Sequence, residues 1–583
     1  MAIQFNSDAL SRFSNVNFGA DDAIANLGEN NDLVQNGNRG LGVFAKIRFT
    51  STKANNNAVR TELLKALGQA FSLDGIGEQG GKTTFSQEFM NRLEQILGPA
   101  FKRDDFGIGA DGVVNSGKPL TQRRIQAVYN AATDYAAQAR FNKKFEDVSA
   151  LLDGQPIRAI MGDDRDEGWS LRLNNLAELA AKVHDVALKL NDEDGASATI
   201  VQGDLKIAFK VEYGAIRAKL TFGGKTRRVD LTITSQDLGQ RMTNTINALY
   251  NSFTEKRDGN LTYGRAALAD EALGTYRDLT PEEDLDTTKD CLLRKVAGGL
   301  LKEKAGVSDA AISKLTNRDI LEIARLLCRT DDVQAVKDAI VSAIKFGKKF
   351  EEASALLKGK PISEIVGNNR DAGWDAKVGD FAVLAAKIHD GALTLNKVGD
   401  SATVEQGEFK VDLTWGNGGI TASLRIDGKT RSVANFATTK EELCIAMDET
   451  VSSLYDSFTE KKDGDLTYGR AVLADKVLAY YKEQSEKESK EYLDGPVNCP
   501  FRTFASGFLM TKARVTEEQI GKLTNRQLED FVVMACEAGD VSGIKDIVAS
   551  TIEELEDEQP VNVEKKAEPP ANGEKTYINI NEI

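Results

Sequence analysis

The stretch FNKKFEDVSALLDGQPI at residues 141–157 recurs as FGKKFEEASALLKGKPI at residues 346–362. A second long stretch, SFTEKRDGNLTYGRAALAD, begins at Ser252 and recurs from Ser457 as SFTEKKDGDLTYGRAVLAD. Shorter blocks, GDDRDEGW and KLTNRDI, recur between and after them in the same order. Blocks of this length in a constant order do not arise by chance, so the sequence indicates two diverged copies of one segment in tandem.

Each copy has the residue pattern of an α+β unit. In the first copy, apolar residues at helical spacing run from Leu176 to Leu190, and alternating apolar residues follow from Leu205 to Tyr213. Two further strands, separated by the turn Gly223-Gly224, complete a three-stranded antiparallel meander. One face of such a meander is apolar, so helices are expected to cover it. A helical pair around the Leu-Thr-Asn-Arg motif is expected to close each unit.

The predicted fold class is α+β, with an N-terminal helical domain followed by the two repeats. Apolar residues at helical spacing from Val59 to Ile96 indicate the helical domain. A leader rich in Asn, Ser and Gly and an acidic, Pro-containing tail are typical of disorder. The stretch 333–357 has no Pro and a single Gly, so a helix is expected to join the repeats. The predicted domains are a loosely ordered leader (1–57), the helical domain (58–140), repeat 1 (141–345), repeat 2 (346–551) and a disordered tail (552–583).

Charge and composition restrict the partners. The 583-residue chain has a formal net charge of −15, which disfavours nucleic acid and anionic membranes as main partners. We expect no membrane span, because no apolar run is long enough, and the first residues lack the features of a secretory signal. Five cysteines, an odd number, disfavour a disulfide framework. A cytoplasmic location, or export without a cleaved signal peptide, is therefore expected. Basic residues on the outer side of the first sheet are expected to be a solvated strand face: Lys206, Lys210, Lys219, Lys225, Arg227 and Arg228.

Two histidines, His184 and His389, are the only ones and occupy equivalent positions. Each borders an apolar helix stripe, which is typical of a packed structural histidine, and a catalytic role is the alternative. The aspartate after each histidine points about 100° away on the helix, so it cannot easily orient that histidine as in a triad. One histidine per copy lacks companions at zinc-ligand spacing, and Lys256 and Arg265 stand where a Ca²⁺ loop needs oxygen ligands. The sequence predicts no metal site and no cofactor.

The turn R-D-x-G-W and the segment L-T-Y-G-R-A stay nearly unchanged between the copies. Core packing tolerates exchange among apolar residues at small cost, so packing alone does not explain retained Arg, Tyr and Trp. These residues form either an internal network that stabilises the fold or a binding site, since Arg and Trp are common interface hot spots. The candidate binding residues are Arg165, Asp166, Trp169, Tyr263 and Arg265 in the first copy, and Arg370, Asp371, Trp374, Tyr468 and Arg470 in the second.

The sequence leaves two classes of function open. The favoured one is a non-enzymatic, tandem-repeat interaction or scaffold protein with a protein partner, including the case of a leaderless exported bacterial effector. Duplication suits binding because two linked sites raise the effective concentration of each other. The alternative is a hydrolase or transferase with one site per repeat near His184 and His389. The sequence shows no matched nucleophile, base and orienting group, which disfavours the enzyme.

Overall fold

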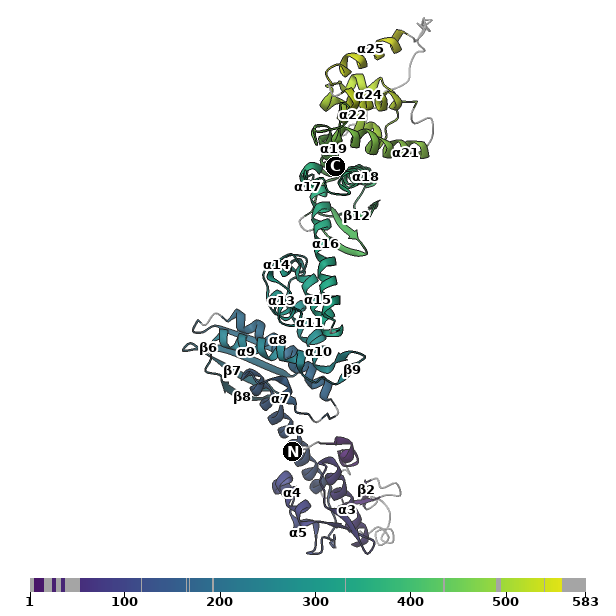
Figure 1. Cartoon of the computed structure of the whole chain (residues 1–583). Helices are drawn as coiled ribbons and strands as arrows, with labels where there is room; N and C mark the ends of the chain where they lie inside the picture. The colour runs from purple at the N-terminus through teal and green to yellow at the C-terminus, as the bar shows by residue number, and fades with distance from the viewer. Residues whose placement is uncertain are drawn as a thin grey trace, which may run out of the picture. The chain divides into compact units, whose positions relative to one another are not determined.

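The chain folds into two compact units, described here from a computed structural model. Each unit combines helices with small antiparallel sheets (Figure 1). Unit 1 comprises Met1–Thr280, Cys291–Leu300 and Ala324–Asp331, and unit 2 comprises Pro281–Asp290, Leu301–Ile323 and Asp332–Ile583. The structure describes residues 5–14, 24–27, 33–36, 53–116, 118–163, 165–166, 168–190, 193–330, 332–433, 436–488, 494–538 and 541–557.

The N-terminal part of unit 1 is mainly helical, as predicted, but it also contains two hairpins. Its core includes Val59 and Leu63 of α3 and Phe89 of α4, all buried. Leu10 and Phe13 join this core, so the described part of the leader is packed, in contrast to the loose order predicted for residues 1–57. Its elements are η1 (Ser7–Leu10), α1 (Ser11–Ser14), β1 (Ile24–Leu27), β2 (Leu33–Asn36), α3 (Lys53–Ala70), β3 (Ile76–Gln79), β4 (Lys82–Phe85), α4 (Gln87–Leu97), η2 (Gly98–Ala100) and α5 (Arg103–Phe106).

Two long helices cross predicted domain boundaries. Helix α6 (Gln122–Leu152) begins at the N-cap Thr121, whose side chain accepts a hydrogen bond from the Arg124 N–H, and it continues through the boundary predicted at 140. Helix α16 (Val333–Leu357) continues through the boundary predicted at 345, so the expectation of a helix over 333–357 is confirmed. Both boundaries therefore lie inside helices, where the periodicity of the sequence continues without a break.

Each unit contains a four-stranded antiparallel sheet with its strands in chain order. The prediction of three strands was wrong, because the first strand of each sheet was missed. Only Ile200 is buried among the six residues of β5, and only Val404 among those of β11, so their alternation signal is weak. The strands are β5 (Ser197–Gln202), β6 (Leu205–Glu212), β7 (Ala215–Phe222) and β8 (Lys225–Asp230) in unit 1, and β11 (Ser401–Gln406), β12 (Phe409–Gly416), β13 (Gly419–Ile426) and β14 (Lys429–Ser432) in unit 2.

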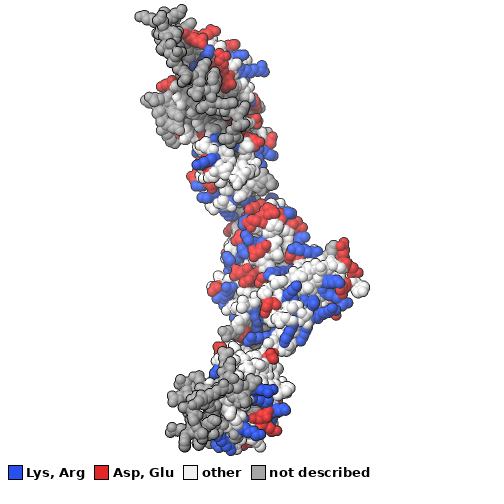
Figure 2. All heavy atoms as spheres, turned by 180° about the vertical axis from the view of Figure 1, so that it is seen from behind, with Lys and Arg blue, Asp and Glu red and all other residues white. Residues whose placement is uncertain are grey.

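One face of each sheet is covered by helices, as expected. In unit 1, Ile207, Phe209 and Val211 of β6 are buried under α8 (Trp169–Lys189) and α9 (Ser235–Ala248) (Figure 1). In unit 2, α18 (Trp374–Thr394) and α19 (Lys440–Ser452) take the corresponding places in the chain. The outer face of the first sheet is exposed and rich in Lys and Arg (Figure 2), which agrees with a solvated strand face. Short helices α7 (Ile157–Met161) and α17 (Ile362–Val366) precede α8 and α18.

The segment S-F-T-E-K was expected to be helical, but it leads into a β-hairpin. Gly259 and Gly464 have φ of 53° and 57°, and glycine at the first central position of a two-residue loop favours a hairpin turn. A helical stretch with one π-helical turn follows each hairpin. These elements are η3 (Leu249–Asn251), β9 (Lys256–Asp258), β10 (Leu261–Thr262), α10 (Tyr263–Ala266), η4 (Ala267–Ala272) and α11 (Leu273–Leu279), then η5 (Ser453–Asp456), β15 (Lys461–Asp463), β16 (Leu466–Thr467), α20 (Tyr468–Val472), η6 (Leu473–Val477) and α21 (Leu478–Glu488).

Helices surround each Leu-Thr-Asn-Arg motif, as predicted. Thr316 and Thr524 hydrogen-bond with Asp319 and Gln527 at a helix start, which satisfies free backbone N–H groups there. The alternating isoleucines at 578 and 580 lie outside the described residues, as does most of the predicted tail. The helices are α12 (Glu282–Leu285), α13 (Leu292–Ala305), α14 (Asp309–Ile312) and α15 (Asn317–Thr330), then α22 (Pro500–Lys512), α23 (Glu517–Gly521), α24 (Asn525–Ala538) and α25 (Ile544–Asp557).

Candidate functional site

The structure brings Arg165, Trp169 and Tyr263 together in unit 1. The Arg165 guanidinium lies 4.8 Å from the Trp169 ring and 4.5 Å from the Tyr263 ring, a distance at which cation–π attraction operates. Its Nη2 pairs with Glu255 at 2.6 Å. Trp169 is buried and meets the Phe253 and Tyr263 rings edge to face. The arginine is therefore held on an aromatic base while 34% of its side chain stays exposed.

The same arrangement occurs in unit 2. The Arg370 guanidinium lies 5.1 Å from the Trp374 ring and 4.1 Å from the Tyr468 ring, and it pairs with Glu460 at 2.6 Å. The Arg370 side chain is also 34% exposed. Trp374 meets the rings of Phe458 and Tyr468 edge to face. We call these two groups the arginine–aromatic clusters, consisting of Arg165, Trp169, Tyr263 and Glu255 in unit 1 and Arg370, Trp374, Tyr468 and Glu460 in unit 2.

Local backbone geometry places the cluster residues. Gly168 and Gly373 precede the tryptophans with φ of 85° and 95°, a region that favours glycine, and each starts a long helix. The Trp169 N–H donates to the Asp166 carbonyl at 3.1 Å, and the Trp374 N–H donates to Asp371 in the same way. The Asp166 side chain pairs with Arg172, whereas Asp371 is exposed. The R-D-x-G-W motif is therefore a helix-starting turn that directs its tryptophan inward.

The second retained arginine of each copy lies on another tyrosine. Arg265 lies 4.6 Å from the Tyr250 ring, and Arg470 lies 4.8 Å from the Tyr455 ring. Both tyrosines are buried, and both arginines are half-buried. Arg265 and Arg470 thus stabilise the packing of the helix after the hairpin rather than completing the clusters. Glu255 and Glu460 were not among the predicted candidates, although both belong to the repeated S-F-T-E-K block.

His184 lies in a buried network. Its Nδ1 lies 2.8 Å from the Tyr276 hydroxyl and its Nε2 lies 3.2 Å from the Thr243 hydroxyl. Because Thr243 donates its own proton to the Gly239 carbonyl, the geometry assigns the imidazole proton to Nε2, and Nδ1 accepts from Tyr276. Burial lowers the pKa of His184 to about 4, against an opposing effect of Asp185. The imidazole is 5% exposed and both nitrogens are occupied, which is the geometry of a structural histidine.

This lowered pKa predicts a pH dependence of stability in unit 1. The pKa of an unfolded histidine is about 6.5, so between about pH 6.5 and pH 4 the unfolded state binds more protons than the folded state. The stabilising contribution is complete above about pH 6.5 and is lost as the pH falls toward 4, by roughly 2–3 kcal/mol. Calorimetry of the wild type and His184→Gln between pH 7 and 4.5 measures it. The stability difference between the two proteins should shrink with falling pH, and a constant difference would contradict the assignment.

His389 has different neighbours at the equivalent position. Its Nδ1 lies 3.2 Å from Asp390 and its Nε2 lies 3.5 Å from Asp448, while Tyr480 donates to Asp390 at 2.6 Å. The imidazole is 1% exposed. Burial raises the pKa of Asp448 and raises the pKa of the nearby Cys444 thiol to about 11. Cys444 Sγ contacts the His389 carbonyl and not its ring, so this group does not have the geometry of a cysteine–histidine nucleophile.

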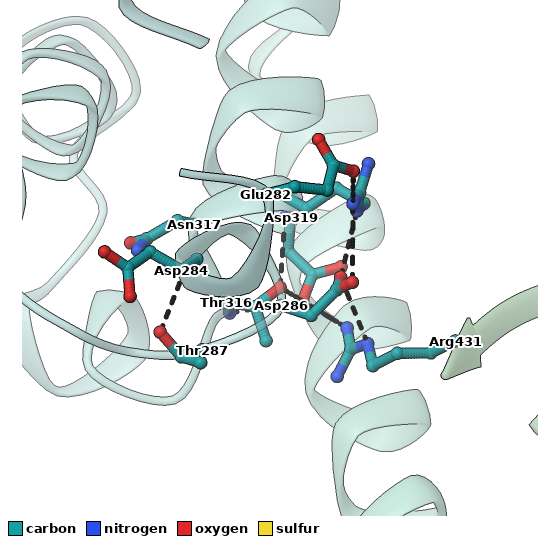
Figure 3. Close-up of polar contacts among 9 residues, drawn as sticks. Glu282, Asp284, Asp286, Thr287, Thr316, Asn317, Asp319 and Arg431 are labelled. Carbon is teal, nitrogen blue, oxygen red and sulfur yellow. Dashed lines mark hydrogen bonds and ion pairs between the residues drawn. The ribbon is translucent and has the colours of Figure 1, made fainter. Parts of the chain in front are cut away.

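A third polar group surrounds Arg431 in unit 2 (Figure 3). Arg431 Nη2 lies 3.1 Å from Asp319, and its Nε lies 3.7 Å from Asp286. Arg318 also binds Asp286 through Nε at 2.9 Å, and its hydrogen bonds to Asp286 and Glu282 raise its pKa. The Arg431 side chain is only 7% exposed. The residue pattern placed this position on a strand but held no signal for its distant carboxylates.

The Asn of the Leu-Thr-Asn-Arg motif has a structural role. Asn317 is fully buried and donates from Nδ2 to the carbonyls of Asp284 and Lys289 (Figure 3 shows Asn317 beside Asp284). Asn525 donates to the Val497 carbonyl in the same way and accepts from Arg502. A buried amide that bonds loop carbonyls offsets their desolvation cost. The repetition of this motif is explained by loop anchoring.

The cysteines show no reactive arrangement among the described residues. All five are free, and Cys328 and Cys536 are fully buried. Burial raises the pKa of both thiols to about 12, so neither is a thiolate near neutral pH. Among the described residues, no three His, Cys, Asp or Glu side chains gather in a metal-binding arrangement. No described helix is both long enough and apolar enough to cross a membrane.

Comparisons with known proteins identify no relative. No family model matches the chain, and neither a curated protein nor a solved structure is significantly similar to it. The site geometry therefore carries the functional proposal alone.

Proposed function

We propose that the chain is a tandem-repeat protein-interaction or scaffold protein in which each copy presents one arginine–aromatic cluster. The observation that carries this proposal is the matched geometry of Arg165 and Arg370. Each guanidinium lies on a Trp and a Tyr ring, and each pairs with one exposed glutamate. The retained sequence blocks support the view that the two copies derive from one duplicated unit.

The clusters have the physical properties of interface anchors. A side chain that is already held by two rings loses little rotamer freedom on binding, so more of the contact energy appears as affinity. The carboxylates of Glu255 and Glu460 are 62% and 66% exposed, and ion pairs of this exposure contribute at most about 1 kcal/mol. A carboxylate on a partner protein can therefore replace each glutamate at small cost. Arginine and aromatic residues are also the types enriched at interface hot spots.

The double variant Arg165→Ala/Arg370→Ala tests the proposal. We expect at least a tenfold loss of captured partner in affinity purification with mass spectrometry, because both anchors are removed, while the melting temperature falls by only a few degrees. The matched control is Arg158→Ala/Arg526→Ala, which removes two exposed arginines paired with Asp163 and Asp494 outside the clusters. The control should retain both binding and stability.

The other outcomes decide between the two explanations of the retained residues. A large fall in melting temperature with no specific loss of binding would assign the clusters to fold stabilisation alone. An unchanged melting temperature with unchanged binding to every captured protein would contradict both explanations. The histidines are unsuited as controls because they lie in buried networks.

A further inference from the structure

Unit 1 contains a cleft of about 210 Å³ between helices α6 and α8 and the turn that joins β5 to β6. Its polar rim includes Lys144, Asp147, Arg172 and Asp204. Leu176 is 7% exposed, so the apolar part lies at the base of the cleft. The apolar floor consists of Val148, Leu176, Leu179 and Leu205.

The corresponding cleft of unit 2 has lost this floor. It lies between α16, α18 and the β11–β12 turn, and Phe409 is the apolar residue at its base. Aligning the two copies places Phe381 and Phe409 where the first copy has Leu176 and Leu205. The two phenyl rings lie 5.3 Å apart at 41°, and Phe381 is fully buried. In unit 2 the protein's own rings therefore occupy the space above the floor.

The mouths of the two clefts also differ. In unit 2, Lys377 of α18 binds Glu352 of α16 at 2.7 Å, so an ion pair joins the two helices across the cleft. In unit 1 the corresponding residues pair elsewhere. Arg172 binds Asp166 at 3.1 Å, and Asp147 binds Lys143 on its own helix at 3.0 Å. The unit 1 cleft thus keeps its apolar floor and has no such pair between these two positions.

We infer that the unit 1 cleft receives an aromatic side chain of the partner protein, an inference that rests on the proposed interaction function. Unit 2 shows that phenyl rings fit between these elements of the fold. Aromatic side chains seated in apolar pockets are common centres of protein interfaces. A polypeptide is favoured as the source because the Arg172–Asp166 ion pair places the cleft beside the turn that carries Arg165. A partner bound at the arginine–aromatic cluster therefore lies next to the cleft.

A titration of the full chain with N-acetyl-L-phenylalaninamide tests the inference. With ¹³C-labelled Leu and Val methyl groups, the phenyl ring should shift the signals of Val148, Leu176, Leu179 and Leu205. The methyls of Leu384, the counterpart of Leu179 in unit 2, should not move. N-acetyl-L-alaninamide should bind at least tenfold more weakly. Absent shifts, or equal shifts at Leu384, would overturn the inference.

Two variants exchange the floors of the clefts. Leu176→Phe/Leu205→Phe gives unit 1 the residues that unit 2 already tolerates, and we expect at least a tenfold loss of probe binding there. Phe381→Leu/Phe409→Leu should create new shifts at Leu384. A closed variant that binds the probe as well as the wild type would contradict the assignment, and so would free L-phenylalanine binding more tightly than the blocked form, because that result indicates a small-molecule site.

Failure of this inference can be told apart from failure of the proposed function. Probe binding is measured without any partner, so it does not depend on the arginine–aromatic clusters. If the probe binds but Arg165→Ala/Arg370→Ala leaves partner capture unchanged, the cluster proposal alone fails. If capture depends on the arginines while the probe shifts none of the floor methyls, the cleft inference alone fails.

Discussion

Replacing Gly469 with alanine is expected to destabilise unit 2 by about 3 kcal/mol or more. A Cβ atom at this position would lie 1.9 Å from the Leu454 carbonyl oxygen and 2.4 Å from that of Ser457. Both obstacles are backbone atoms, so a side-chain rotation cannot relieve them, and helix α20 would have to move away from η5. Urea denaturation followed by tryptophan fluorescence measures the effect, because Trp374 contacts Tyr468, the neighbour of Gly469.

Gly264 provides an independent repetition of this prediction in unit 1. Its Cβ would lie 2.0 Å from the Ser252 carbonyl oxygen and 2.2 Å from that of Leu249. The matched controls are Gly347→Ala and Gly299→Ala, which lie in helices with no atom within 4 Å of the added Cβ. Alanine there should stabilise by up to about 1 kcal/mol. A Gly469→Ala protein as stable as its control would contradict the close approach, whereas loss of the unit 2 transition would confirm it.

Replacing Arg431 with alanine is expected to cost about 3–5 kcal/mol, also in unit 2. The side chain is 7% exposed and lies between Asp319 and Asp286, and its ring contacts with Phe346 and Phe350 are both at 4.9 Å. Removal leaves Asp319, 14% exposed, without this buried cation, and the desolvation of that charge is then uncompensated (Figure 3). Calorimetry of the full chain should show the unit 2 transition at lower temperature.

Arg227 is the control that the chain itself supplies. It occupies the equivalent strand position and lies 5.1 Å from Phe141 and 4.7 Å from Phe145, but it is exposed. Arg227→Ala should change stability by less than about 1 kcal/mol, because only an exposed cation–π contact and a hydrogen bond to Asn142 are lost. Equal effects of the two substitutions would show that the carboxylates around Arg431 contribute nothing. Asp319→Asn, which removes the opposite charge but retains a polar group, should lose part of the same energy.

Local pattern predicted much of the fold correctly, and its failures have physical causes. The apolar stripe from Leu176 predicted α8, and alternation from Leu205 predicted β6, because both periodicities arise within one element. The first strand of each sheet was missed because five of its six residues are exposed or only half-buried. The Asp-Gly turn at Gly259 was interpreted as a helical joint, although the same dipeptide favours hairpins.

The candidate site was predicted in part. Repetition selected Arg165, Trp169 and Tyr263, which the structure brings into one cluster over a sequence separation that periodicity cannot bridge. It also selected both histidines, which the structure places in buried networks. The cleft of unit 1 was not predicted, because it depends on residues from two helices and a turn. Its signal was nevertheless present as the exchange of Leu176 and Leu205 for Phe381 and Phe409 between the copies.

The tripeptide Lys-Thr-Arg shows where sequence information ends. It occurs in both copies, and the sequence by itself determined that each arginine, Arg227 and Arg431, lies on a strand after a tight turn, because turn and strand signals are local. Only the tertiary structure decided that Arg431 is buried against carboxylates while Arg227 is exposed. The reason is that Asp286 and Asp319 come from more than about 100 positions away, and no local pattern encodes which distant charge a folded chain brings near.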